Sequence, residues 1–195
     1  MILNLKKIDM KQNYLLITVF AVLLFSCKTK IDNATYADLT DKGNEITNLA
    51  QLVLLANVSQ AMQAGGPVYA VEFCNLKASA IIDSLNRANN CQISRISAKN
   101  RHPENNLKTA TDKNLWTIFE AGTVTDTLIQ DNKKLIYYKP IKTAMPACLK
   151  CHGVTGSDID QATSEKLKKL YPNDLATGYQ LNNFRGLWKI EFAAN

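Results

Sequence analysis

This chain of 195 residues contains few histidines, and it lacks the sequence patterns typical of nucleic-acid-binding proteins and of enzymes. The chain has only two histidines, against five cysteines. No Lys/Arg-rich stripe is interleaved with aromatic residues, so we expect no nucleic-acid partner despite the net charge of +6. We find no βαβ pattern and no constellation of catalytic side chains, and we therefore expect a protein that is not an enzyme.

Long apolar runs are also missing, and the one short run lies near the N-terminus. Three lysines among the first eleven residues precede an apolar run over residues 14–25. This run is well under the ~20 residues of a membrane-spanning helix, and its basic flank is typical of a signal peptide. Leu24-Phe25-Ser26-Cys27 resembles a bacterial lipoprotein box, in which the cysteine becomes the lipidated first residue. We expect a lipoprotein-type signal peptide over residues 1–26 and lipidation of Cys27.

An uncleaved anchor helix is the alternative for the same run, and Met10 could replace Met1 as the start. Both alternatives leave the domain in the periplasm, held at a membrane. Lys28 follows the cysteine, which by resemblance to enterobacterial sorting favours the outer membrane. Residues 27–43 are polar with small side chains and predict a tether, so residues 44–195 form the single domain.

The most specific motif of the chain is Cys148-Leu149-Lys150-Cys151-His152. Cys-x-x-Cys-His is the attachment signature of a c-type haem. Two thiols each add across a haem vinyl group, and the two-residue gap sets the sulfurs about one porphyrin edge apart. The adjacent histidine offers an imidazole nitrogen to the iron as an axial ligand. The motif predicts one covalent haem c, held by Cys148, Cys151 and His152.

Two other kinds of site share the Cys-x-x-Cys pair. A redox disulfide of the thioredoxin type normally lies near a βαβ pattern, which is missing here. A structural zinc site needs four ligands, and Cys74 with Cys148, Cys151 and His152 would supply a Cys₃His set. With two histidines in the chain, a chance Cys-x-x-Cys-His is rare, and covalent haem attachment outside the cytoplasm agrees with the export signal.

Apolar residues at helical spacing predict two helices in the first half of the domain. The first covers residues 44–64, and Gly65-Gly66-Pro67 ends it and starts the second. The second ends at Asn89-Asn90, and its apolar face contains Cys74. Core packing explains such a cysteine on its own, because free cysteine is among the most buried residue types. Two helices with so tight a joint predict an antiparallel pair.

The second half of the domain consists mostly of β-branched and aromatic runs, which predict strands. The expected elements are a strand over 91–99, a polar turn over 99–106, a helix over 112–121, a hairpin of 123–129 and 133–141, a helical turn over 165–171, and a strand over 187–192. Helices followed by hairpin-linked strands predict an α+β domain with an antiparallel sheet.

Several short sequence words occur in an order that is known from one family. These words are Val71-Glu72-Phe73-Cys74 after Gly66-Pro67, Arg95-Ile96-Ser97, Arg101-His102-Pro103-Glu104-Asn105, Tyr137-Tyr138-Lys139-Pro140-Ile141, the Cys148–His152 motif with Gly153, Tyr171-Pro172-Asn173-Asp174-Leu175-Ala176-Thr177-Gly178-Tyr179, and Phe184-Arg185-Gly186. Over about residues 45–193 the chain resembles the bacterial haem-c-binding PAS-like domains. They occur alone in exported proteins and as extracytoplasmic sensors of signalling proteins. The resemblance implies a PAS-like antiparallel sheet with a long N-terminal helix pair and one haem.

The resemblance also bears on the second axial ligand of the iron. In such domains a cysteine can hold the iron opposite the motif histidine, and the matching residue here is Cys74. The residues alone leave other candidates open, namely Cys91, His102, Met62 and Met145. His102 is the main rival, because the family more often has asparagine before the proline, and we expect Cys91 to be a structural or free thiol.

Together these features predict a membrane-tethered periplasmic haem protein that senses redox state or a diatomic gas. A thiolate ligand favours Fe(III), so reduction could release Cys74 and open a coordination position. The alternative is a single-haem electron-transfer protein, and a peroxidase is a third possibility. The chain has no output module of its own, so a sensor needs a separate redox or signalling protein as its partner.

Overall fold

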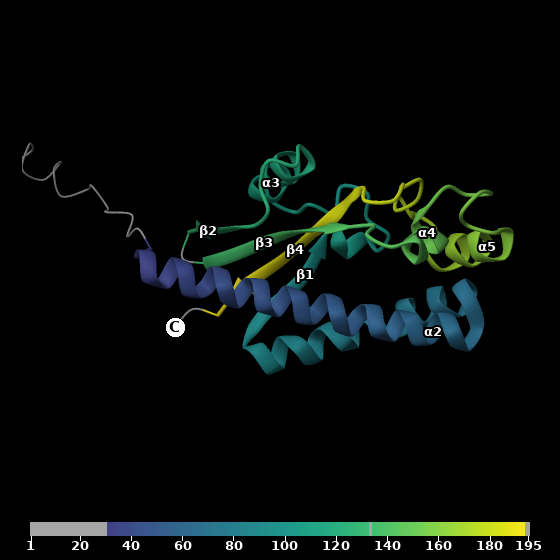
Figure 1. Ribbon diagram of the computed structural model, residues 1–195, viewed down its shortest axis with the longest axis horizontal. Helices are drawn as coiled ribbons and strands as arrows, with labels where there is room; N and C mark the ends of the chain where they lie inside the picture. The colour runs from purple at the N-terminus through teal and green to yellow at the C-terminus, as the bar shows by residue number, and fades with distance from the viewer. Residues whose placement is uncertain (1–30, 133, 194–195) are drawn as a thin grey trace, which may run out of the picture. The chain divides into compact units, whose positions relative to one another are not determined.

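A long helical hairpin covers one face of a four-stranded antiparallel sheet (Figure 1). The computed structural model describes residues 31–132 and 134–193, so the predicted signal peptide and Cys27 lie outside the described residues. From Asn33 onward the chain forms one unit. Its elements are α2 (Asn33–Asn89), β1 (Cys91–Ile96), a 3-10 turn (Pro103–Asn105), α3 (Ala110–Glu120), β2 (Thr127–Asp131), β3 (Lys134–Lys142), α4 (Pro146–His152), α5 (Gln161–Leu170) and β4 (Phe184–Phe192).

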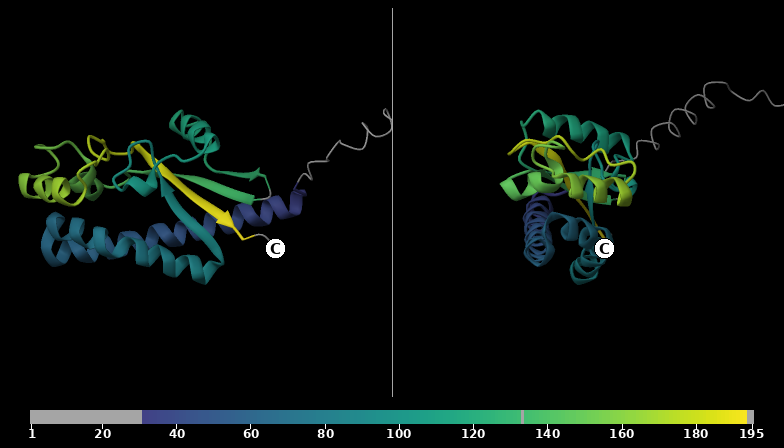
Figure 2. Two further views of the ribbon diagram at one scale, coloured as in Figure 1. Left: turned by 180° about the vertical axis from the view of Figure 1, so that it is seen from behind. Right: turned by 90° about the vertical axis from the view of Figure 1, so that its right-hand side faces the viewer.

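The element α2 consists of two helices that meet at Gly65 and Gly66, which both have non-helical dihedral angles. Gly66 has φ 69° and ψ −166°, a conformation that is almost confined to glycine. Pro67 follows in the first turn of the second helix, where its missing N–H costs no hydrogen bond. Figures 1 and 2 show the second helix folded back beside the first. The predicted antiparallel helix pair is confirmed.

The first helix begins earlier than the sequence predicts. Residues 33–43, which we expected to belong to a tether, are helical and part of the domain unit. Gly43 is buried under the ring of Tyr137, and any Cβ at this position would collide with that ring. The structure differs from the expected tether because only Leu39 and Gly43 of this segment face the core, and two such positions are too few to show a helical stripe in the sequence.

The sheet has the strand order β1-β4-β3-β2, with every neighbouring pair antiparallel. The predicted hairpin is confirmed, because β2 and β3 pair around Asn132, which has a positive φ of 56°. The last strand, β4, lies in the middle of the sheet between β1 and β3. Antiparallel strands and separate helices make the domain α+β, as predicted.

Alternate residues of each strand divide the core into two layers. On β3, Tyr137 belongs to the layer under α2, whereas Ile136 and Tyr138 belong to the layer under α3. Figure 2 shows α3 on the face of the sheet opposite the hairpin. A third apolar cluster joins α2 to α5 through Val71, Ile159, Leu167 and Tyr171.

The motif lies on the short helix α4. Sequence periodicity did not predict this helix because it has only seven residues. Among the helices of the described residues, none is both long and apolar enough to cross a bilayer.

Candidate functional site

The motif residues lie on and at the end of α4. Cys148 and Cys151 are three residues apart, so both lie on one face of the helix, and both are half-buried free thiols. Gly153 ends the helix by donating its N–H to the carbonyl oxygen of Leu149 at 2.8 Å. A Cβ on Gly153 would lie 2.5 Å from the Asp158 side chain and 2.7 Å from that carbonyl oxygen. The close approach therefore requires glycine directly after His152.

His152 is oriented by one hydrogen bond to the backbone. Its Nδ1 lies 2.8 Å from the carbonyl oxygen of Ala176. Because a carbonyl oxygen only accepts, Nδ1 carries the proton and Nε2 has a free lone pair. Burial lowers the pKa of His152 well below its usual value, and the guanidinium groups of Arg101 and Arg185 lower it further. The ring is therefore neutral, in the tautomer that a metal ligand bound through Nε2 requires.

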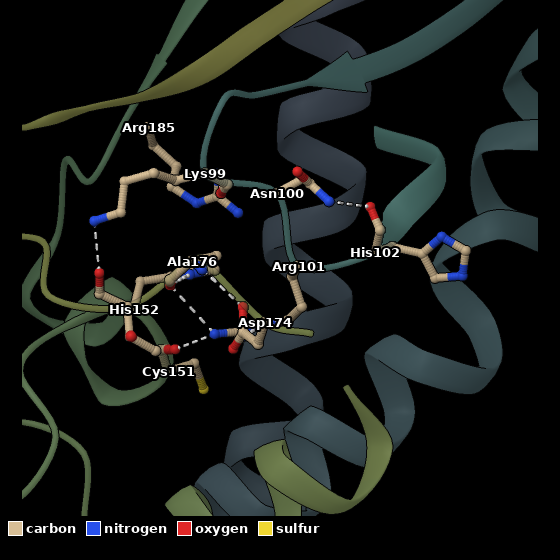
Figure 3. Close-up of polar contacts among 10 residues, drawn as sticks. Lys99, Asn100, Arg101, His102, Cys151, His152, Asp174, Ala176 and Arg185 are labelled. Carbon is tan, nitrogen blue, oxygen red and sulfur yellow. Dashed lines mark hydrogen bonds and ion pairs between the residues drawn. The ribbon is translucent and has the colours of Figure 1, made fainter. Parts of the chain in front are cut away.

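The Ala176 carbonyl is held in place by a salt bridge that sequence reasoning missed. Arg101 pairs with Asp174 at 3.0 Å, and both side chains are largely buried, with 14% and 10% exposed. Arg101 also donates to the carbonyl oxygens of Cys151 and Ala176, as Figure 3 shows. Asp174 in turn accepts the N–H of Ala176 at 2.8 Å. One arginine thus connects the motif helix, the loop that orients His152 and the turn after β1.

Two further backbone bonds fix the same loop against α4. The N–H of Tyr179 donates to the carbonyl oxygen of His152 at 2.9 Å, and the N–H of Gly178 donates to that of Gly153 at 2.7 Å. The only signal of these contacts in the sequence was that Arg101 and Asp174 occur in words shared with the family. Their pairing spans 73 positions, so no local spacing could have indicated it.

Cys74 lies on the second helix of α2 and is half-buried. Burial raises the pKa of its thiol, whereas the positive charges of Arg95 and Arg101 act in the opposite direction. Cys74 also interacts electrostatically with Cys151. One turn earlier, Val71 belongs to the apolar cluster against which Cys151 packs. The structure therefore brings Cys74 to the motif.

Three other candidates for the second iron ligand are either exposed to solvent or distant from the motif. His102 is exposed, and its Nδ1 accepts the N–H of Glu104 at 3.3 Å. Figure 3 shows its ring turned away from His152 and Cys151. Cys91, the first residue of β1, pairs with Phe192 and packs on the core under α2. Met145, which precedes α4, is 41% exposed.

The structure gives no support to the two alternative sites, a structural zinc site and a thioredoxin-type disulfide. In residues 31–132 and 134–193, no group of three or more histidine, cysteine, aspartate or glutamate side chains is placed to hold a metal ion. The Cys₃His zinc set is therefore not assembled in this arrangement. All pairings within the sheet are antiparallel, so the motif lacks the βαβ surroundings of a thioredoxin-type disulfide.

Comparison with known proteins identifies the family. Residues 17–193 match the model of the Tll0287-like family. Among solved structures, the chain is similar to the cyanobacterial heme-protein Tll0287, with a TM-score of 0.64 and 18% sequence identity. The similarity covers 81% of this chain and 96% of that chain, and comparison with curated proteins gives no match. These findings confirm the predicted PAS-like family and α+β fold. The chain belongs to the Tll0287-like family.

Proposed function

We propose that this protein is a c-type haem protein in which thioethers join one haem to Cys148 and Cys151 and His152 binds the iron. The contact between His152 Nδ1 and the Ala176 carbonyl carries this proposal, because it leaves Nε2 free in a neutral ring. Metal-binding histidines usually donate their other ring nitrogen to such a carbonyl. When bound, the haem supplies an iron that exchanges one electron and accepts axial ligands.

The residues present fit such a group. Cys148 and Cys151 are unpaired thiols on one face of α4. Burial raises the pKa of Cys151 to about 11, so at neutral pH this cysteine is a protonated thiol. Several cations and two unpartnered polar atoms surround His152, and they suit a ligand that is apolar in its body and charged at its edge.

Cys74 is the residue that would hold the iron together with His152. A sulfur binds iron as the thiolate, and the charges of Arg95 and Arg101 favour that form. Burial disfavours it, so the thiolate depends on the positive charge of the iron and is held less well after reduction. Loss of this bond would remove one attachment of the second helix of α2 to the motif. A helix that is released when the iron is reduced, or when a diatomic gas takes its place, is a device for sensing.

Electron transfer is the alternative function, and one observation favours it. Met145 and Val154, which flank α4, are 41% and 46% exposed. Apolar residues around a haem edge suit brief contacts with a redox partner. In this alternative the iron keeps both axial ligands throughout, and only electrons leave the site.

We further propose that the protein is a periplasmic lipoprotein anchored at the outer membrane through Cys27. Support comes from residues 1–28 of the sequence alone, with Lys28 after the cysteine favouring the outer membrane. Cys27→Ala should move the protein from the membrane fraction to the soluble periplasm or leave it unprocessed. Membrane retention with a different mature N-terminus would contradict lipidation.

The haem proposal is tested by producing the full chain in a bacterium with c-type maturation. The wild-type protein should keep its haem through denaturing gel electrophoresis, and the double variant Cys148→Ser/Cys151→Ser should lose it. Cys91→Ser is the matched control. Cys91 is the first residue of β1, whereas the site lies beyond the last residue of this strand, so the variant should keep the haem. A wild-type protein that binds one zinc ion and no haem would refute the proposal.

A further inference from the structure

Four cationic side chains gather near His152, and we call them the basic cluster: Arg95, Lys99, Arg101 and Arg185. The three guanidinium groups all interact electrostatically with the His152 ring. Lys99 and Arg185 both lie over the ring of Tyr179, with Lys99 Nζ at 4.3 Å and Arg185 Cζ at 5.3 Å from its centre. Within the described chain, the only ion pair of the cluster joins Arg101 to Asp174. The cluster therefore has a large excess of positive charge.

This excess is costly where the side chains are withdrawn from water. Burial lowers the pKa of Arg95 and of Arg185, and Arg185 is also affected by the charges of Arg101 and Arg95. Arginine stays protonated in proteins, so the cost is electrostatic and is offset only by a counter-charge. Arg95 lies on the same face of β1 as Ile93, which packs under α2, so its side chain points to the face of the sheet that α2 covers, and Cys74 of α2 affects its pKa.

Two polar atoms at the same place are buried without a hydrogen-bond partner. They are the hydroxyl of Tyr179, a residue that is only 5% exposed, and Nε of Arg185. The centre of the Tyr179 ring lies 6.4 Å from that of His152. Buried polar groups in native proteins are nearly always paired, and both of these groups can donate. Two unpaired donors among surplus cations point to an anionic acceptor.

We propose that the basic cluster and the Tyr179 hydroxyl form the site of the two propionate carboxylates of the haem, in which Arg101 stays paired with Asp174 and the other three cations face the carboxylates. The proposal rests on the haem attachment described above. A haem carries its propionates away from the vinyl groups that join it to Cys148 and Cys151. Two carboxylates and Asp174 would nearly neutralise the four cations, and arginine suits carboxylates because it can bind them with two parallel hydrogen bonds. The cluster would then hold the propionate side of a haem whose vinyl side is held by the two thioether bonds.

The test measures the propionates themselves in the full-length haem protein. Expression with 5-aminolaevulinate carrying ¹³C at its carboxyl carbon labels only the propionate carboxyls of the haem. The infrared bands of ionised and protonated carboxyls differ, so a pH series gives the proton affinity of the labelled groups. Arg95→Gln removes a cation for which no hydrogen bond within the protein is found among the described residues. We expect the labelled carboxyls to bind protons about tenfold more tightly in this variant.

Two further variants make the result specific. Tyr179→Phe keeps the ring under Lys99 and Arg185 and removes only the hydroxyl, so it tests the proposal even where Arg95→Gln fails to retain haem. It should also raise the proton affinity of the propionates. Arg87→Gln is the matched control, because Arg87 is exposed in the last turn of α2, about 20 Å along the helix from Cys74. It should titrate like the wild type.

The possible outcomes separate this proposal from the haem proposal. A wild-type protein without covalent haem overturns both. Covalent haem with identical propionate titrations in wild type, Arg95→Gln and Tyr179→Phe overturns only the role of the basic cluster. Inorganic phosphate provides a further test, because saturable phosphate binding to the haem protein that Arg95→Gln abolishes would show that the cluster serves a free anion. That result would also overturn the propionate assignment.

Discussion

A single carbonyl oxygen decides which nitrogen of His152 is available to a metal. Ala176 accepts the proton of Nδ1, and the salt bridge of Arg101 with Asp174 holds that carbonyl in place. The histidine of the motif could be predicted from the sequence, because its type and spacing are specific. Its orienting contacts could not, because they join segments that are far apart in the chain.

Cys74 gives the most informative prediction at the level of single residues. As the second axial ligand it should make the ferric iron low-spin, with thiolate features in the visible and near-infrared spectrum. Cys74→Ala should convert the ferric form to a five-coordinate or water-bound state and raise the reduction potential. Absorption spectra and a potentiometric titration measure both effects.

The matched control is His102→Ala, since His102 is exposed and its ring points away from the motif. We expect the ferric spectrum of this variant to equal that of the wild type. If Cys74→Ala leaves the spectrum unchanged while His102→Ala makes the iron high-spin, the iron has two histidine ligands. Electron transfer would then be the better functional hypothesis.

At the level of elements, the helical hairpin was predictable and its beginning was not. Gly65, Gly66 and Pro67 mark the joint because each has a conformational role that other residues fill poorly. Residues 33–43 extend the first helix although only Gly43 among them is buried, and the contact of Gly43 with Tyr137 depends on the absence of a side chain. Periodicity detects apolar side chains and therefore misses such a contact.

The joint of the hairpin allows a test that depends on the backbone alone. A Cβ at Gly66 would meet no atom within 4 Å, so Gly66→Ala introduces only the strain of its positive φ. We expect it to lower the free energy of unfolding by about 1–3 kcal/mol in urea titrations. Gln63→Ala, at an exposed position of the preceding helix, should change it by less than about 0.5 kcal/mol. Equal effects of the two changes would show that the joint is not strained.

Helix α3 is attached to the sheet by a buried polar network. Asp112 accepts a hydrogen bond from the Tyr138 hydroxyl at 2.9 Å and pairs with Lys189 at 3.2 Å. Burial raises the pKa of Asp112, but the hydrogen bond and the ammonium group together outweigh burial and hold the pKa below its usual value of 3.8. Tyr138 and Lys189 come from the adjacent strands β3 and β4, so one carboxylate ties α3 to the middle of the sheet.

This network predicts a loss of stability in acid. The folded state holds the Asp112 proton less tightly than the unfolded state, so the stabilisation is complete above the unfolded pKa and is lost as the pH falls through 3.8 toward the folded value. Asp112→Asn should lower stability by about 1–3 kcal/mol at pH 7, and its difference from the wild type should shrink toward pH 3. Thermal melts at a series of pH values measure this. Asp83→Asn, an exposed change on α2, should show no such trend, and a constant difference for Asp112→Asn would contradict the assignment.

At the level of the whole molecule, the sequence predicts which helices and strands form better than it predicts which of them contact one another. The motif, the helix pair and the hairpin each have a local signature. In contrast, the site forms where α2, α4, the turn after β1 and the loop before β4 converge, and only the folded chain brings Arg101, Asp174 and Ala176 together. The apolar cluster that joins Val71 to Leu167 and Tyr171 likewise connects distant segments and places the helix of Cys74 against the motif.

The two functional hypotheses differ in what reduction does to this arrangement. In the sensing hypothesis, reduction releases Cys74, and the second helix of α2 loses one of its attachments to the rest of the site. Its backbone amides over residues 68–80 should then exchange with solvent about tenfold faster, which requires a loss of only ~1.4 kcal/mol of local stability. In the electron-transfer hypothesis the ligands stay bound and exchange is the same in both oxidation states.

Hydrogen–deuterium exchange with mass spectrometry on oxidised and dithionite-reduced protein measures this difference directly. Cys74→Ala is the decisive variant, because without the sulfur both oxidation states should exchange like the reduced wild type. Helix α3, on the opposite face of the sheet, provides the internal control and should not change. A wild-type protein whose α2 exchanges identically in both states would exclude redox sensing through Cys74, since a signal that leaves the helix unchanged has no route to a partner through it.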